Sequence, residues 1–216
     1  MAADPSIESL IDTHLYDASI IQPLEQYVQT QVEEGKYNFS ANRHLLKVYK
    51  FHPSLAKGDI IGKILLKAMM NLPTSDYISC LYLVPLQLHN SEAVQTVIRM
   101  AKLLEAFEME KFWKLAESQK IFPTITNIPG FSQGVENFLV TLFESTYCDV
   151  EVGILQQMLR GGAGDVQRLT KSRGWKMSED GKRIVFSQIN TDAQRGVSGS
   201  TKITMQQVGK VLPLLQ

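Results

Sequence analysis

Histidine side chains can bind metal ions and transfer protons near neutral pH, but the four histidines of this chain match no known motif. No two of them have the spacing of an HxxxH or HExxH metal site. They are His14, His44, His52 and His89. We therefore expect these side chains to be ordinary surface or core residues and not metal ligands.

Two cysteines and a glycine-rich turn are the other features that could serve chemistry. Cys80 and Cys148 lie far apart in hydrophobic stretches without CxxC spacing, so we predict small buried side chains. The turn Gly161-Gly162-Ala163-Gly164 lacks the Lys-Ser/Thr pair of a phosphate-binding loop and follows a helical pattern. No serine lies in a GxSxG motif. The sequence thus predicts a protein that is not an enzyme and needs no cofactor.

Basic residues are concentrated in one segment, from Arg160 to Arg183, which contains seven basic and three acidic residues. Arg168 and Lys171 are three apart, so a helix here would carry both on one face. Six side chains of this segment form a candidate RNA-facing basic patch: Arg160, Arg168, Lys171, Arg173, Lys182 and Arg183. Against RNA binding, Glu179 and Asp180 would repel phosphates, and no aromatic residues alternate with the basic ones.

The overall composition narrows the class of protein. The chain has 216 residues, with 22 Lys and Arg against 22 Asp and Glu and a formal net charge of zero. This balance argues against a protein whose main task is to coat a polyanion. The N-terminus lacks the basic and apolar regions of a signal peptide, and the longest apolar stretch, Ile78 to Leu88, is about half a membrane span. We expect a cytoplasmic protein without membrane contact.

The hydrophobic pattern up to about residue 120 is helical. Apolar residues recur at helical spacing in residues 24–35, 41–51, 60–69 and 90–107, and proline, glycine or asparagine separates these segments. The segment 77–88 is apolar nearly all round and predicts a helix enclosed by neighbours. Short connections favour antiparallel pairs. We predict a mainly α fold that begins with an irregular HEAT/TPR-like stack of helical hairpins.

A change of pattern follows the segment Lys120 to Gly130, in which two prolines and a glycine exclude a continuous helix. Helices are predicted from residue 135, over 150–159 and over 165–173, and then Asp180-Gly181 precedes a strand over 183–187. This is the order of a winged helix. A polar loop over 190–200 and an amphipathic segment, Ile203 to Leu212, complete the chain. We predict two domains, residues 1–130 and 131–216.

These elements resemble a known family. A Leu-Leu-Glu-x6-Phe-Trp segment, Leu103 to Trp113, before a winged helix is similar to the PCI proteins that scaffold the proteasome lid, the signalosome and translation initiation factor 3. An ordered set of motifs is most similar to the initiation-factor members. It comprises LExYVxxQ from Leu24, Ala41-Asn42, LxxYxFxP from Leu46, ILLKA from Ile64 with Asn71-Leu72-Pro73, and Gly174-Trp175.

The resemblance implies a non-catalytic scaffold subunit of translation initiation factor 3 that supports assembly of the pre-initiation complex. The implied partners are the other subunits, above all the L subunit, and the small ribosomal subunit through the complex. PCI subunits pair through their winged helices, so strand 184–186 could extend a partner's sheet and segment 203–212 could join a helical bundle. The candidate partner interface comprises Arg168, Lys171, Ile184, Val185, Phe186, Ile203, Val208, Val211 and Leu212.

Two other functions fit the same sequence. One is a winged-helix protein that binds nucleic acid directly through the basic patch. The other keeps the scaffold role but places it in a proteasome-lid or signalosome complex.

Overall fold

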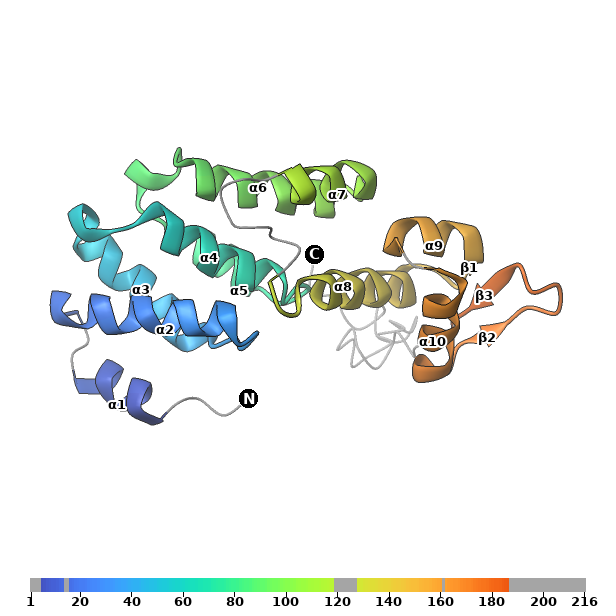
Figure 1. The fold of residues 1–216 in the computed structure, drawn as a ribbon, viewed down its shortest axis with the longest axis horizontal. Coiled ribbons are helices and arrows are strands. Elements are labelled where there is room, and N and C mark those ends of the chain that lie inside the picture. Colours follow the sequence, from blue (N-terminus) through green and yellow to red (C-terminus); the bar gives the residue numbers. More distant parts are fainter. Residues whose placement is uncertain (1–4, 14–15, 119–127, 161, 187–216) are drawn as a thin grey trace, which may run out of the picture.

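The structure is a computed structural model that describes residues 5–13, 16–118, 128–160 and 162–186 (Figure 1). Its first part consists of seven α-helices with short 3₁₀ turns between them. The helices are α1 (Pro5–Thr13), α2 (Ile21–Glu33), α3 (Phe39–Phe51), α4 (Gly58–Met69), α5 (Asp76–Leu81), α6 (Glu92–Glu105) and α7 (Met109–Ser118). The turns are η1 (Ala18–Ile20), η2 (Pro53–Leu55) and η3 (Leu86–Leu88).

These helices form two layers. In one layer α2 packs against α4 and α4 against α6, and in the other α1 packs against α3 and α3 against α5. Successive helices also pack against each other, as α2 with α3 and α6 with α7 do. The predicted stack of helical hairpins and the mainly α fold class are confirmed.

Local sequence signals set several of the helix ends. The Asn38 side chain caps α3 by accepting a hydrogen bond from the backbone N of Ala41 at 3.1 Å. Gly35 has a φ of 69°, a left-handed conformation that glycine adopts without strain just after α2 ends. These residues let α3 return against α2.

Hydrogen bonds between polar groups, most of them buried, tie the first helices together. The hydroxyl of Tyr49 on α3 donates to Glu25 on α2 at 2.5 Å, and the Lys57 ammonium just before α4 donates to the same carboxylate at 2.5 Å. The Gln31 and Asn42 amides also bond to each other in the α2–α3 contact, at 2.9 and 3.2 Å. Satisfied polar groups of this kind fix which faces of the helices meet.

The second part is a winged helix. Its elements are α8 (Phe131–Thr146), β1 (Asp149–Glu151), α9 (Val152–Leu159), α10 (Ala163–Arg173), β2 (Lys176–Met177) and β3 (Arg183–Val185). The three strands form an antiparallel sheet in the order β1-β3-β2. Figure 1 shows this sheet at the opposite end of the molecule from α1, with α8 between it and the helical stack.

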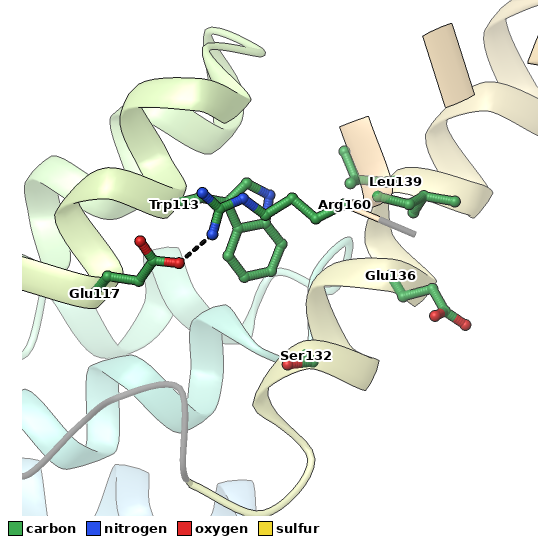
Figure 2. A pocket seen from close by; sticks show the side chains of 7 residues that line it. Trp113, Glu117, Ser132, Glu136, Leu139 and Arg160 are labelled. Atoms are coloured by element: carbon green, nitrogen blue, oxygen red, sulfur yellow. Dashed lines mark hydrogen bonds and ion pairs between the residues drawn. The ribbon is translucent and has the colours of Figure 1, made fainter. Parts of the chain in front are cut away.

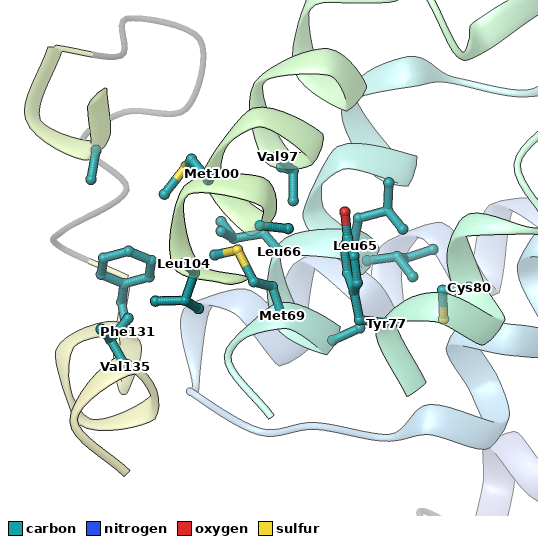
Figure 3. Packing of buried hydrophobic residues seen from close by; sticks show 14 of the residues in the cluster. Leu65, Leu66, Met69, Tyr77, Cys80, Val97, Met100, Leu104, Phe131 and Val135 are labelled. Atoms are coloured by element: carbon teal, nitrogen blue, oxygen red, sulfur yellow. The ribbon is translucent and has the colours of Figure 1, made fainter. Parts of the chain in front are cut away.

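One hydrophobic core runs through the stack and into α8. Figure 3 shows Phe131 and Val135 of α8 beside Leu104 of α6 and near Met69 of α4. A close backbone contact exists here as well, because a Cβ atom on Gly134 would lie 2.5 Å from the carbonyl oxygen of Met70. The winged helix is thus anchored on the stack by the first turns of α8. The division into residues 1–130 and 131–216 stays a prediction.

The structure corrects three details of the sequence-based expectations. The segment 77–88 is not one enclosed helix, because α5 ends at Leu81 and Pro85, which lacks a backbone N–H, precedes the separate turn η3. Residue 150 begins no helix, since Val150 is the centre of β1. Cys80 is buried as predicted, whereas Cys148 is exposed.

Candidate partner interface on the winged helix

An aromatic cluster supports the candidate interface from inside. Phe186 follows β3 and stacks with Phe143 of α8, with ring centroids 6.5 Å apart, and Trp175 meets Phe186 edge to face at 5.0 Å. The Trp175 indole N–H donates to Oε1 of Glu144 at 2.8 Å. The Gly174-Trp175 motif therefore contributes a buried side chain to the hydrophobic core. Gly174, at a φ of 70°, ends α10 and directs Trp175 inward.

Strand β3 cannot add a partner's strand at its edge, so this part of the expected mechanism is wrong. β3 is the central strand, paired with β1 over residues 183–185 and with β2 on its other side. Ile184 and Phe186 are 0% and 3% exposed, so only Val185, at 40%, presents its side chain on the surface. The sequence showed the hairpin but not β1, which occupies the edge that a partner would need.

The basic patch is largely neutralised within the molecule. Four of its six members form ion pairs: Arg160 with Glu117, Arg168 with Glu136 at 3.0 Å, Arg173 with Glu144 at 3.8 Å and Arg183 with Asp149 at 2.8 Å. All four carboxylates lie outside residues 160–183, on α7, α8 and β1. The local charge surplus in the sequence therefore overstates the positive charge of this surface.

Two cations of the patch remain without a carboxylate partner in the part of the chain that the structure describes, namely Lys171 on α10 and Lys182 in the wing. Lys171 is exposed and precedes the end of α10 by two residues. Lys182 lies beside the acidic tip of the wing, where Asp180 accepts a hydrogen bond from its backbone N at 3.1 Å. Lys171 is thus the cation of the candidate interface best placed to meet a charge on another molecule.

The predicted residues are only partly brought together. Arg168 and Lys171 share the exposed face of α10, and Val185 lies on the sheet. Ile203, Val208, Val211 and Leu212 lie outside the described residues, as do the predicted loop 190–200 and His14. Both the partner interface and the RNA-facing patch stay predictions.

A contact between α7 and α9 joins the winged helix to the stack (Figure 2). Arg160, at the end of α9, extends over the indole ring of Trp113 and pairs with Glu117. The Trp113 indole N–H donates to the carbonyl oxygen of Met158 at 3.4 Å. Hollows of about 320 and 570 Å³ flank this contact. Phe112 and Trp113 are both buried, and no sequence signal indicated that Trp113 contacts Arg160.

Ionisable groups with shifted pKa values lie in the helical stack. Burial raises the pKa of Tyr77 and of Cys80 to about 12, and it raises the pKa of Tyr49, which also donates to Glu25. In the described parts of the chain, no three His, Cys, Asp or Glu side chains are grouped closely enough to hold a metal ion. None of the described helices is long and apolar enough to cross a membrane.

The stack of helical hairpins, followed by a winged helix with a three-stranded sheet, defines a protein of the PCI type. The family model described as CSN8/PSMD8/EIF3K matches residues 55–195, which include helices α4 to α7 of the stack and all the described elements of the winged helix. The chain belongs to this family.

Curated relatives match over most of their length. A protein of Nematostella vectensis is 30% identical over 80% of this chain and 80% of its own. A protein of Drosophila ananassae is 31% identical over 91% of this chain and 87% of its own. A protein of Xenopus tropicalis is 31% identical over 80% of this chain and 79% of its own. All three carry the name eukaryotic translation initiation factor 3 subunit K.

Proposed function

We propose that this chain is the corresponding subunit of translation initiation factor 3 and acts there as a non-catalytic scaffold in the cytoplasm. It would support assembly of the pre-initiation complex on the small ribosomal subunit through protein–protein contacts. The observation that carries this proposal is the similarity, over four fifths or more of the chain, to relatives that bear this subunit's name.

The proposed mechanism is docking of the winged helix on a neighbouring subunit, for which the L subunit is our first candidate. Arg168 and Lys171 on α10 would face this neighbour, with Val185 as the exposed apolar contact of the sheet. The amphipathic segment 203–212 would add apolar area in a helical bundle. No strand exchange is required, because surface complementarity and burial of the central contacts can hold such an interface.

The test is affinity capture of the tagged full chain from a cytosolic extract, with and without nuclease, followed by mass spectrometry. Nuclease-resistant recovery of the initiation factor 3 subunits supports the proposal. Recovery of proteasome-lid or signalosome subunits instead would place the chain in another complex. Loss of every partner on nuclease treatment would favour the function as a nucleic-acid-binding winged helix.

Charge reversal on α10 tests the docking face. Lys171→Glu changes a cation that has no carboxylate partner among the described residues, so weaker capture would report an external contact. Arg168→Glu also removes the ion pair with Glu136, and its effect on folding must be measured separately. If the double variant folds normally and captures the partners as well as the natural chain does, this face is not the interface.

A further inference from the structure

The outer face of the helical stack carries an exposed apolar stripe that the winged-helix contact does not use. Ile78 lies on α5, Tyr82 follows directly after this helix, and Leu86 begins η3. Their exposed fractions are 50%, 80% and 85%. Single exposed apolar residues are common on monomers, but three large ones in a row mark a surface for interaction.

A basic stripe lies on the neighbouring helix of the same layer. Arg43, Lys47 and Lys50 follow each other at intervals of four and three residues on α3, so they share one side of this helix. Arg43 and Lys50 are exposed and Lys47 is half-buried. Because α3 and α5 pack side by side and bury the face turned to the stack's core, their exposed faces both look outward.

The two stripes belong to elements that contact each other, since α3 packs against α5. The positive charge of Arg43 is close enough to α5 to act on the Cys80 thiol, and its guanidinium lies 5.3 Å from the ring centroid of Phe39 at the start of α3. The surface thus combines a row of cations on α3 with a row of apolar side chains on α5 and η3.

These cations differ from four of the six cations of the basic patch, because none of them has a carboxylate partner in the part of the chain that the structure describes. No ion pair involves Arg43, Lys47 or Lys50 within the described residues, and α3 contains no acidic residue. Asp76 is the sole acidic residue between positions 76 and 88, and its carboxylate already accepts from the Tyr37 hydroxyl at 3.0 Å. The positive charge of the stripe is therefore available to another molecule.

We propose that the α3–α5 surface, defined by Arg43, Lys47, Lys50, Ile78, Tyr82 and Leu86, binds an acidic amphipathic helix of a partner protein. The apolar side of such a helix would cover the stripe on α5 and η3. Its flanking Asp and Glu residues would meet the cations on α3. This surface is separate from the winged helix and adds a second docking site to the chain, whichever complex the chain serves.

A protein helix fits this surface better than RNA does. Non-specific RNA surfaces combine cations with aromatic side chains on which bases stack. Here two of the three apolar residues, Ile78 and Leu86, are aliphatic and offer no stacking surface. Aliphatic anchors spaced by about one turn are the pattern by which grooves and faces recognise amphipathic helices.

The test is a selection of peptides about 16 residues long, or roughly four helical turns, from an unrestricted library on the immobilised full chain. We expect the enriched peptides to carry apolar residues at helical spacing flanked by Asp and Glu. Fluorescence anisotropy then measures their affinity for the natural chain and for two variants. Arg43→Glu/Lys50→Glu and Tyr82→Ser/Leu86→Ser should each weaken binding by about tenfold or more, and binding should weaken with salt.

Arg99→Glu/Lys102→Glu on α6 is the matched control. It reverses two exposed helical cations as well, but α6 has no large exposed apolar side chain among its described residues, so binding should change by less than about twofold. Circular dichroism and the melting temperature verify that all variants are folded.

Several outcomes would overturn the proposal. One is enrichment of peptides without acidic residues, or of no peptides at all. Another is equal binding by the natural chain and both surface variants. A third is competition by poly(U) RNA that depends on Arg43 and Lys50 but not on Tyr82 and Leu86, which would assign the surface to nucleic acid.

Discussion

The guanidinium carbon of Arg160 lies 5.8 Å from the ring centroid of Trp113. This contact joins Arg160, the C-cap residue of α9, to α7 of the helical stack. Arg160 adopts a left-handed conformation with a φ of 50°, which is unfavourable for a residue other than glycine. The ring contact and the ion pair with Glu117 favour arginine here in spite of its backbone. Arg160 thus both ends a helix and fastens the winged helix to the stack.

Substitution of Arg160 separates these two roles. Arg160→Ala loses the side-chain contacts but keeps the unfavourable backbone, so we expect the free energy of unfolding to fall by about 1 kcal/mol. Arg160→Gly loses the same contacts and relieves the backbone by about 1 kcal/mol, so it should be close to neutral. Urea denaturation of the three proteins measures the difference. Equal destabilisation of both variants would contradict the backbone argument.

The close approach of α8 to the end of α4 gives a second prediction. Gly134→Ala places a Cβ atom 2.5 Å from the Met70 carbonyl oxygen, and neither backbone can move without disturbing the core around Phe131. We expect a loss of about 2–4 kcal/mol in the free energy of unfolding.

Gly153→Ala in α9 is the control for this substitution, because no described atom beyond the neighbouring residues and the backbone of its own helix lies within 4 Å of the added Cβ. It should leave stability unchanged or raise it by up to about 1 kcal/mol through helix propensity and a less flexible unfolded chain. Thermal or urea unfolding compares the two variants. Similar effects at both glycines would mean that α8 does not approach α4 as closely as the structure shows.

The sequence predicted the elements whose signals are local. The Asp180-Gly181 turn before the β-branched run at Ile184 indicated the hairpin, and the spacing of apolar residues indicated the helices of the stack. β1 escaped prediction because three residues, Asp149–Glu151, are too few to show an alternating pattern. Its existence depends on pairing with β3, which lies more than 30 positions further along the chain.

The candidate site was harder to predict, because charge neutralisation is a property of three-dimensional neighbours. Arg168 and Arg183 form ion pairs with carboxylates of α8 and β1, so the charge count within one segment overestimated the positive charge of this surface. Sequence analysis also missed the cations on α3, which come together only because the helix places them on one side. Their three residues form no run in the sequence, and the apolar stripe beside them was expected to be buried.

The tyrosines of the stack make stability depend on alkaline pH. Desolvation, followed by hydrogen bonds to Asp76 and Glu25, raises the pKa of Tyr37 and of Tyr49, and desolvation raises the pKa of Tyr77 to about 12. Their pKa values in the folded state exceed the value near 10 of an unfolded chain, so the folded state holds these protons more tightly. The resulting stability is complete below about pH 10 and is lost as the pH rises above it.

Absorbance at 295 nm and circular dichroism, recorded together during an alkaline titration, measure this effect. We expect part of the tyrosinate absorbance to appear only as the helical signal is lost. In urea the whole absorbance change should occur near pH 10. Complete tyrosine ionisation with the helices intact would contradict the burial of these side chains.

The two cysteines should differ in reactivity, although both lie in hydrophobic stretches. Cys80 is fully buried in α5, and desolvation, with the nearby Asp76 as a second cause, raises the pKa of its thiol to about 12. Cys148 lies exposed just before β1. Because the thiolate is the reactive species, a disulfide reagent at pH 8 should modify Cys148 in the folded protein and both thiols in urea. Cys148→Ser is the matched control. Its folded form should react with almost none of the disulfide reagent, so almost none of the reagent's coloured thiolate should be released. Rapid reaction of Cys80 in this variant would show that α5 opens readily, and it would then call into question the fixed apolar stripe on which the α3–α5 docking surface depends.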